Sequence, residues 1–227
     1  MSCPRGILWA HWLRRTSSRI TAGAILNVMP TWNDIVAANP DHSHRYAKRW
    51  DVFVAQGRDI DGEARLIDAL AQRGSRMLDA GAGTGRVGAY LLKKGHSVTG
   101  VDVDPYLVSV AQNRLPDGDW HVADLGDESP DPKDFPEGPF DIIYSAGNVF
   151  PFIAPDHRAT AVANLSSRLA DGGRMVLGFA LDRGYTAQQF LADADAAGLT
   201  PQHLFSSWNA DPYDETSTFL VAVLTRN

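Results

Sequence analysis

The chain has 227 residues, enough for one sizeable α/β domain and too few for two ordinary domains with independent cores. Its formal charge of −6 and isoelectric point near 5.6 argue against a surface for duplex nucleic acid, which needs clustered lysine and arginine. The only cysteine is Cys3, so the chain can form neither an internal disulfide nor a cysteine-based metal cluster. We therefore expect no metal and a reducing cytoplasm.

The first 28 residues differ in composition from the rest of the chain. The apolar run 7–10 is interrupted by His11 and then by Arg14, so it is too short to span a membrane and poorly shaped for a secretion signal. A weak amphipathic presequence is one interpretation. Because helical sequence follows Met29 at once, we expect residues 1–28 to be a disordered extension or to precede the true start. We expect no contact with a membrane.

Helical patterns fill residues 31–72. In the second of them Asp41 or Ser43 can cap a helix that carries Tyr46 and Trp50 on one face. His42 and His44 stand close together, but no nearby carboxylate or cysteine completes a metal ligand set, so these two side chains are expected to face solvent.

The stretch 77–102 holds the strongest functional signal. An apolar strand enters a glycine-rich turn, a helix follows, and a second strand over residues 98–101 ends on Asp102. Glycines let the backbone turn sharply and approach a ligand, and a carboxylate at the tip of the next strand can accept hydrogen bonds from both ribose hydroxyls. The stretch therefore predicts a cofactor that contains adenosine.

The spacing of the motif separates two classes of cofactor. A dinucleotide fold needs G-x-G-x-x-G, whereas this chain has Asp79-x-Gly81-x-Gly83-x-Gly85, whose acid would repel a pyrophosphate and suits an ammonium group. The stretch resembles motif I and the following acidic motif of class I S-adenosylmethionine-dependent methyltransferases. A nicotinamide-dependent oxidoreductase, a cofactor-binding module without turnover and a crossover that binds no cofactor are the alternatives.

The rest of the chain alternates strands and helices. Its near-continuous apolar strands predict a sheet that is buried on both faces, hence a three-layer α/β sandwich. The resemblance implies a Rossmann-like, seven-stranded mixed sheet in the order 3-2-1-4-5-7-6, with the last strand antiparallel. Residues 29–227 would form this single domain, with 29–72 as N-terminal lid helices. We expect helices over 106–114, 156–169 and 186–197, and strands over 120–122, 140–145, 174–179, 204–205 and 218–225.

The resemblance also implies where S-adenosylmethionine binds. Asp102 would hold the ribose, Asp124 and Leu125 the adenine, and Asp79 with the glycine turn the methionine end. A helix or turn cap is the alternative role of Asp124. The full set of expected cofactor contacts is Asp79, Ala80, Gly81, Gly83, Gly85, Arg86, Asp102, Val103, Asp124, Leu125, Ser145, Tyr46 and Trp50.

No sequence pattern identifies a catalytic residue. Methyl transfer needs positioning more than a covalent catalyst, and the candidates are Asn148 and Tyr144, with His121, His157 and Asp211 by location alone.

The acceptor is expected to be a small molecule. The fourth strand lacks the Asn/Asp-Pro-Pro-aromatic motif of enzymes that methylate nucleobase amines or glutamine amides. We expect the acceptor to bind between the helix of Tyr46 and Trp50, the turn 148–152 and the loop 208–213. The alternative is that the aromatic residues there pack in the core. A looser resemblance links the chain to tellurite-resistance methyltransferases; it rests on Tyr46, Arg49, Trp50, Gly57, Ile60, 62–67 and 147–149.

Overall fold

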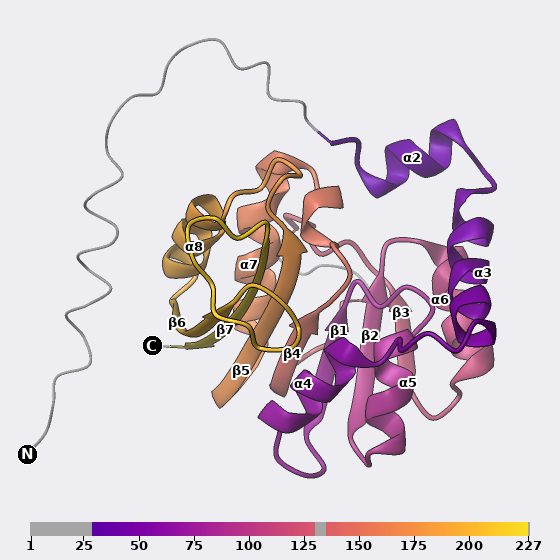
Figure 1. The fold of residues 1–227 in the computed structure, drawn as a ribbon, viewed down its shortest axis with the longest axis horizontal. Helices are drawn as coiled ribbons and strands as arrows, with labels where there is room; N and C mark the ends of the chain where they lie inside the picture. The colour runs from indigo at the N-terminus through magenta and orange to yellow at the C-terminus, as the bar shows by residue number, and fades with distance from the viewer. Residues whose placement is uncertain (1–28, 130–134, 227) are drawn as a thin grey trace, which may run out of the picture.

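The computed structural model describes residues 29–129 and 135–226, so the extension expected at residues 1–28 lies outside the described residues. Strands and helices alternate along the chain (Figure 1). Within the described ranges, no helix is both long and apolar enough to cross a membrane. The elements are α2 (Trp32–Ala38), α3 (His42–Ala55), α4 (Gly62–Leu70), β1 (Arg76–Ala80), α5 (Arg86–Lys93), β2 (Ser97–Asp102), α6 (Pro105–Arg114), β3 (Asp119–Val122), β4 (Phe140–Ser145), η1 (Phe150–Phe152), η2 (Pro155–His157), α7 (Arg158–Ser167), β5 (Leu169–Ala180), α8 (Ala187–Ala196), β6 (Leu199–Phe205) and β7 (Phe219–Arg226).

The strands form one seven-stranded sheet in the order β3-β2-β1-β4-β5-β7-β6, which confirms the expected topology (Figure 1). The pairs from β3 to β5 are parallel, and β7 runs antiparallel to both of its neighbours. The carboxyl ends of β1, β2, β3 and β4 therefore meet at one edge of the sheet, where ligands of open α/β sheets bind.

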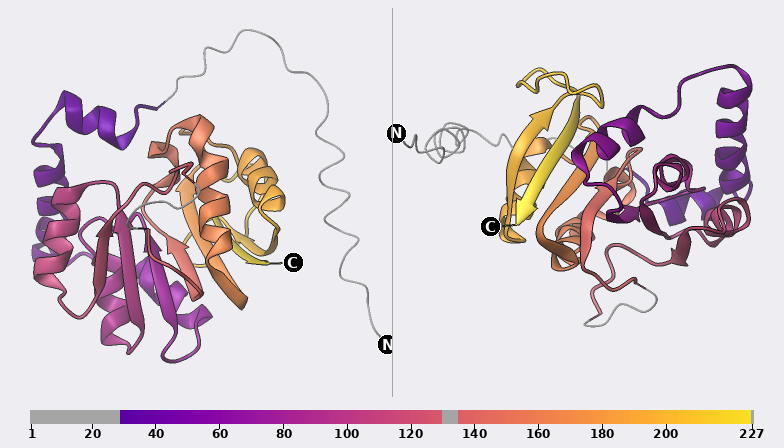
Figure 2. Two further views of the ribbon diagram at one scale, coloured as in Figure 1. Left: turned by 180° about the vertical axis from the view of Figure 1, so that it is seen from behind. Right: turned by 90° about the horizontal axis from the view of Figure 1, so that it is seen from below.

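Helices cover both faces of the sheet (Figure 2). Alternation along β1 directs Met77 to the face that packs on α4, α5 and α6, and directs Leu78 to the face that packs on α7 and α8. The three-layer expectation is thus confirmed.

One expected helix is wrong at its ends. The helix predicted over 156–169 is α7, which stops at Ser167, and Pro155 begins a separate 3₁₀ turn before it. Leu169 is already in β5, because it pairs with Phe140 of β4. The glycines at 172–173 lie inside β5, where the register with β4 shifts.

Trp120 of β3 packs against a set of glycines beneath the first crossover. A Cβ added to Gly88 would lie 2.7 Å from its ring, one added to Gly118 would lie 2.6 Å away, and one added to Gly100 would overlap the ring. The indole Nε1 donates a hydrogen bond to the Leu115 carbonyl, 2.9 Å away. These glycines therefore make room for the indole and let β2 and β3 lie close to α5.

Gly100→Ala is expected to lower the free energy of unfolding by about 1–3 kcal/mol, because the new methyl group overlaps Trp120 and overpacks a closed core. Urea unfolding measures the change. Gly62→Ala is the matched control: its methyl group meets only the end of the Arg65 side chain, at 3.7 Å, and its effect should stay within about 0.5 kcal/mol. Equal stability of the Gly100 variant and the parent would contradict this packing account.

Candidate functional site

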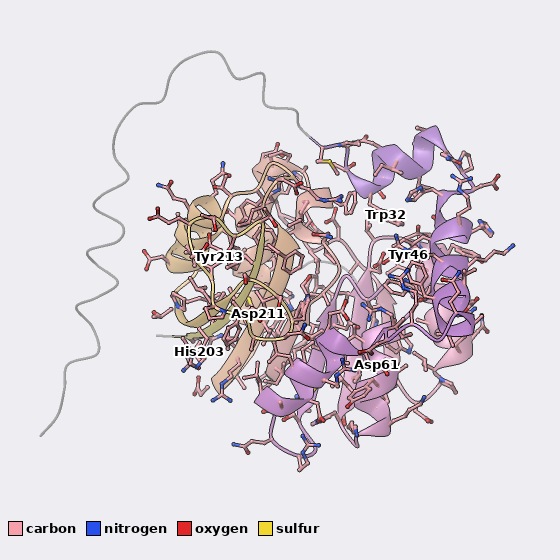
Figure 3. All side chains as sticks on the ribbon, viewed as in Figure 1. Trp32, Tyr46, Asp61, His203, Asp211 and Tyr213 are labelled. Carbon is pink, nitrogen blue, oxygen red and sulfur yellow. The ribbon has the colours of Figure 1, made fainter. Side chains whose placement is uncertain are left out.

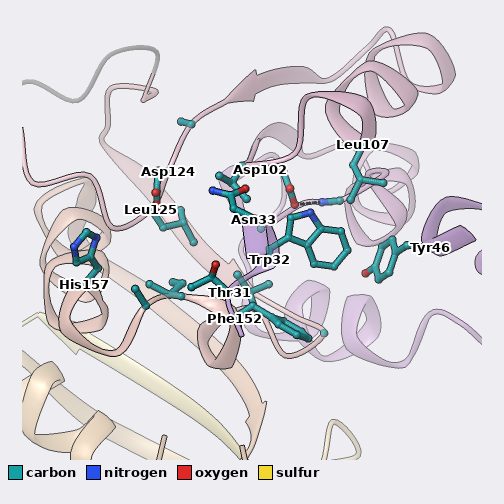
Figure 4. A pocket seen from close by; sticks show the side chains of 18 residues that line it. Thr31, Trp32, Asn33, Tyr46, Asp102, Leu107, Asp124, Leu125, Phe152 and His157 are labelled. Atoms are coloured by element: carbon teal, nitrogen blue, oxygen red, sulfur yellow. Dashed lines mark hydrogen bonds between the residues drawn. The ribbon is translucent and has the colours of Figure 1, made fainter. Parts of the chain in front are cut away.

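A cavity lies at the carboxyl ends of β1 to β4, under the N-terminal helices (Figure 4). The strand ends form its floor, α2 and α3 form a roof, and the loop after β4 closes one side. The lining residues are Thr31, Trp32, Asn33, Tyr46, Gly81, Gly83, Asp102, Val103, Leu107, Ala123, Asp124, Leu125, Gly147, Val149, Phe152, Ile153, Ala154 and His157.

The glycine turn forms part of the floor. Gly81 and Gly83 line the cavity with positive φ angles of 85° and 56°, which favour glycine. A Cβ on Gly81 would overlap the Val149 side chain of the loop after β4. Gly85 lies outside the lining, and a Cβ there would press on Leu115 and Trp120, so this third glycine serves packing.

Asp102 lies between the glycine turn and the cavity. Its Oδ2 accepts a hydrogen bond from the Gly83 N–H at 2.8 Å, drawn in Figure 4, and its Oδ1 accepts one from the Asp104 N–H at 2.9 Å. A carboxylate offers about four acceptor positions, so positions remain for two hydroxyl donors. Burial raises the pKa of Asp102 to about 6.

Asp79 lies under the glycine turn rather than on the cavity surface. It is 2% exposed, and it lies beside the buried side chain of Tyr144. Burial raises the pKa of Asp79 to about 7, against the opposing effects of Tyr144, Arg86 and the Gly88 N–H. The chain thus keeps an acid buried here at a cost in stability.

The third strand supplies the far end of the cavity. Asp124 and Leu125 both line it, beside His157 (Figure 4). The Asp124 Oδ1 accepts from the Gly126 N–H at 2.9 Å, so this side chain also shapes its own turn. The Asn164 amide of α7 donates to the Leu125 carbonyl at 3.0 Å and fixes the backbone there.

Asp104 fastens the roof to the sheet. It is the N-cap of α6, and it is 4% exposed. Its Oδ2 accepts from the Trp32 Nε1 of α2, 2.8 Å away, and from the Ser43 hydroxyl of α3. The sequence signals only the cap, because the partners lie more than 60 residues away along the chain.

Arg158 fastens the side wall. It is 3% exposed and donates to the carbonyls of Ile153 at 3.1 Å, of Pro151 at 3.2 Å and of Gly184. Burial lowers its pKa. The loop that brings Phe152 and Ile153 to the cavity is held by these hydrogen bonds, and no sequence pattern signals them.

Several expected contacts lie away from the cavity. Ala80 and Ser145 are buried in their strands. The Arg86 guanidinium pairs with Glu63 at 2.7 Å and stacks on Trp50 at 4.2 Å; Trp50 and Arg86 line a neighbouring cleft instead.

Neither of the two catalytic candidates lines the cavity. Tyr144 is a fully buried residue of β4. The Asn148 Oδ1 accepts from the Ala180 N–H at 2.6 Å, so this side chain joins the loop after β4 to the end of β5. The adjacent Gly147 lines the cavity in its place.

The loop 208–213 also lies elsewhere. Asp211 and Tyr213 are found over β5 to β7, apart from Trp32 and Tyr46 (Figure 3). Trp208 packs on Gly178 in the core. His121 lies on β3 and His157 alone of the three location-based candidates reaches the cavity. Roof and side-wall residues that sequence reasoning did not assign to the cofactor are Thr31, Trp32, Asn33, Phe152, Ile153 and Ala154.

Comparison with known proteins agrees with this geometry. The family model of a methyltransferase domain matches residues 77–173. The crystal structure of a TehB-like S-adenosylmethionine-dependent methyltransferase from Corynebacterium glutamicum is 46% identical, with a TM-score of 0.78, and the match covers 83% of this chain and 100% of that one.

Curated relatives carry several activities. Magnesium-protoporphyrin O-methyltransferase of Rhodobacter capsulatus is 33% identical over 45% of this chain and 46% of its own. Human glycine N-methyltransferase is 31% identical over 58% of this chain and 50% of its own. The chain thus spans about half the length of these two relatives. The family model and the match that covers all of the Corynebacterium chain identify this chain as a class I S-adenosylmethionine-dependent methyltransferase of the TehB-like kind.

Proposed function

We propose that the enzyme methylates a small molecule, held with the cofactor in the cavity beneath α2. The observation that carries this proposal is the roof: the Trp32 indole donates a hydrogen bond to the buried Asp104, so α2 partly covers the strand ends, which face a cavity rather than a flat surface. A partial cover of this kind limits the access of water and favours a compact acceptor over a macromolecule.

The cavity residues fit S-adenosylmethionine. We assign the ribose to Asp102, which has acceptor positions left after its two backbone hydrogen bonds, and the adenine to Val103, Asp124 and Leu125. The methionine end would lie over Gly81 and Gly83, where a side chain on Gly81 would overlap Val149.

When bound, S-adenosylmethionine would supply a methyl group that its sulfonium already activates for transfer, and Asp102, Asp124 and the turn of Gly81 and Gly83 would hold it. The protein's part is to align the acceptor in line and to exclude water. Asp102, Asp124, Tyr46 and His157 are the ionisable side chains in the described lining, and we assign none of them as a catalytic base. We also place the enzyme in the cytoplasm, because Cys3 alone cannot make an internal disulfide.

Methyl-labelled S-adenosylmethionine tests the acceptor class. The enzyme would be incubated with a bacterial metabolite pool and, in parallel, with tRNA, DNA and cell protein. Label is expected in the metabolite fraction, and an Asp102→Ala enzyme gives the background. Label that enters a macromolecule in preference to the metabolites would refute the proposal.

A further inference from the structure

We propose that Asp104 is a positioning residue for the reaction: its carboxylate holds Trp32 of α2 over the bound cofactor and thereby slows the departure of S-adenosylhomocysteine. The hydrogen bond from the Trp32 Nε1 to the Asp104 Oδ2 is called the latch below. This inference rests on the proposed function, because it takes the cofactor to lie in the cavity beneath α2.

The two carboxylate oxygens of Asp104 have separate partners. Oδ1 accepts from the N–H groups of Tyr106 at 2.9 Å and Leu107 at 3.3 Å, and these bonds cap α6. Oδ2 accepts from the Trp32 Nε1 at 2.8 Å and from the Ser43 hydroxyl. Serine and asparagine, each with a single acceptor oxygen, cap a helix about as well as aspartate. The cap therefore does not need the second oxygen, and both partners of that oxygen belong to the roof.

The helix α2 has few other attachments. None of its seven residues is buried, and among the described hydrogen bonds only the latch joins one of its side chains to a part of the protein beyond its own N-cap. The Trp32 ring also meets the rings of His42 at 5.1 Å, Tyr46 at 5.3 Å and Phe152 at 6.0 Å. A short helix that buries no residue has low local stability. Its position over the cavity therefore depends on the latch and on these ring contacts.

The latch and the expected ribose site lie in one loop. The Asp104 N–H donates to the Asp102 Oδ1 at 2.9 Å, and Asp102 and Trp32 line the same cavity (Figure 4). A ligand on Asp102 thus lies beneath the helix that Asp104 holds, and it leaves most easily when α2 moves away from the sheet. Loss of the latch should therefore speed dissociation of the ligand without slowing its association.

A purely structural role for Asp104 predicts a different result. If the carboxylate served only to cap α6, a substitution that keeps the cap would leave the binding of the cofactor unchanged. A substitution on α2 that spares Asp104 would then have no effect on the cofactor through this carboxylate either.

Two variants remove the latch from opposite ends. Asp104→Ser keeps a capping hydroxyl for α6 but lacks the second oxygen. Trp32→Phe keeps an aromatic ring but lacks the N–H donor. Asp51→Asn is the matched control, because it weakens the exposed ion pair with Arg114, 3.0 Å long, which joins α3 to α6 and does not involve α2.

Surface plasmon resonance on the immobilised full chain measures both rate constants for S-adenosylhomocysteine. We expect dissociation to be about tenfold faster in Asp104→Ser and in Trp32→Phe, because each loses a hydrogen bond that involves a charged group. Association should be no slower than in the parent. The Trp32→Phe/Asp104→Ser double variant should dissociate no faster than Asp104→Ser alone, since both changes remove the same bond. Asp51→Asn should keep the parental rate constants.

The outcomes separate the two claims. Parent-like affinity in a folded Asp102→Ala protein contradicts the placement of the cofactor and, with it, the proposed function. If Asp102→Ala binds weakly while Trp32→Phe and Asp104→Ser release the ligand at the parental rate, the latch is refuted and the proposed function stands. Slower association with unchanged dissociation, or equal acceleration in Asp51→Asn, also refutes the latch. Should Asp104→Ser fail to fold, Trp32→Phe decides alone.

Discussion

Replacing Asp102 with alanine is expected to weaken binding of S-adenosylhomocysteine by about 1.5–3 kcal/mol, roughly ten- to 150-fold. The carboxylate faces the cavity and can accept hydrogen bonds from ribose hydroxyls, and it also holds the Gly83 N–H of the glycine turn at 2.8 Å. Calorimetry measures the loss, with NAD as the comparison ligand, which should not bind to the parent.

Two variants make the result specific. Asp102→Asn keeps the shape and one acceptor oxygen, so its loss should be smaller than that of alanine. Asp117→Ala removes an acid from the turn before β3, outside the cavity, and should bind as the parent does. Parent-like affinity in an Asp102→Ala protein that is folded by circular dichroism would show that the ribose assignment is mistaken.

Asp79→Asn is expected to stabilise the free protein at pH 8 while it weakens cofactor binding. The carboxyl has a pKa near 3.8 when unfolded and about 7 in the folded chain, because burial disfavours its charge. Between these values the folded state holds the extra proton, so the free energy of unfolding falls as pH rises. Asparagine cannot ionise, so it removes this fall in the free energy of unfolding. At about 1.4 kcal/mol per pKa unit, the fall amounts to a few kcal/mol at pH 8.

Thermal melts at pH 8 and pH 5 measure this effect, and the gain should be large at pH 8 and small at pH 5. Asp68→Asn is the control of opposite sign. Its carboxylate accepts from His96 at 3.0 Å and from Arg73 at 2.6 Å, and these partners keep its pKa below the ordinary value against the effect of burial. That variant should lose stability at pH 8. An Asp79→Asn protein that is less stable than the parent at pH 8 would contradict the conclusion that burying the ionised Asp79 carboxylate lowers the stability of the free protein.

The ionisation of Asp79 should also appear in the pH dependence of cofactor binding. The groups that face Asp79 are Tyr144 from β4, Arg86 and Gly88 from α5, and Asp102 from β2. An ammonium-bearing ligand favours the ionised carboxylate, so the affinity for S-adenosylhomocysteine should rise as pH increases through about 7, with a further contribution from Asp102 near 6. Asp79→Asn should flatten the upper part of this profile. A flat profile in the parent would exclude the role.

The strand order and the glycine turn could be predicted because their signals are local. Asp79, the glycines and Asp102 stand at fixed spacings around one crossover, and that crossover places Gly81, Gly83 and Asp102 together in the cavity. The ends of α7 could not be predicted, since Leu169 joins a strand only through pairing with Phe140 of β4.

The roof shows where helical periodicity stops being informative. Tyr46 and Trp50 are four residues apart and share a helix face, yet one turn, about 5.4 Å, separates them along the axis. Tyr46 therefore lines the cavity, and Trp50 covers Arg86 in the neighbouring cleft. Phe152 reaches the cavity through a loop that Arg158 holds, a contact that depends entirely on tertiary packing.

The most direct test of the account is a crystal structure of the enzyme with S-adenosylhomocysteine. We expect the ribose hydroxyls on Asp102, the adenine beside Asp124 and Leu125, and the ligand covered by Trp32. Electron density for the ligand in the cleft of Trp50 and Arg86, with the cavity under α2 free of it, would contradict the account.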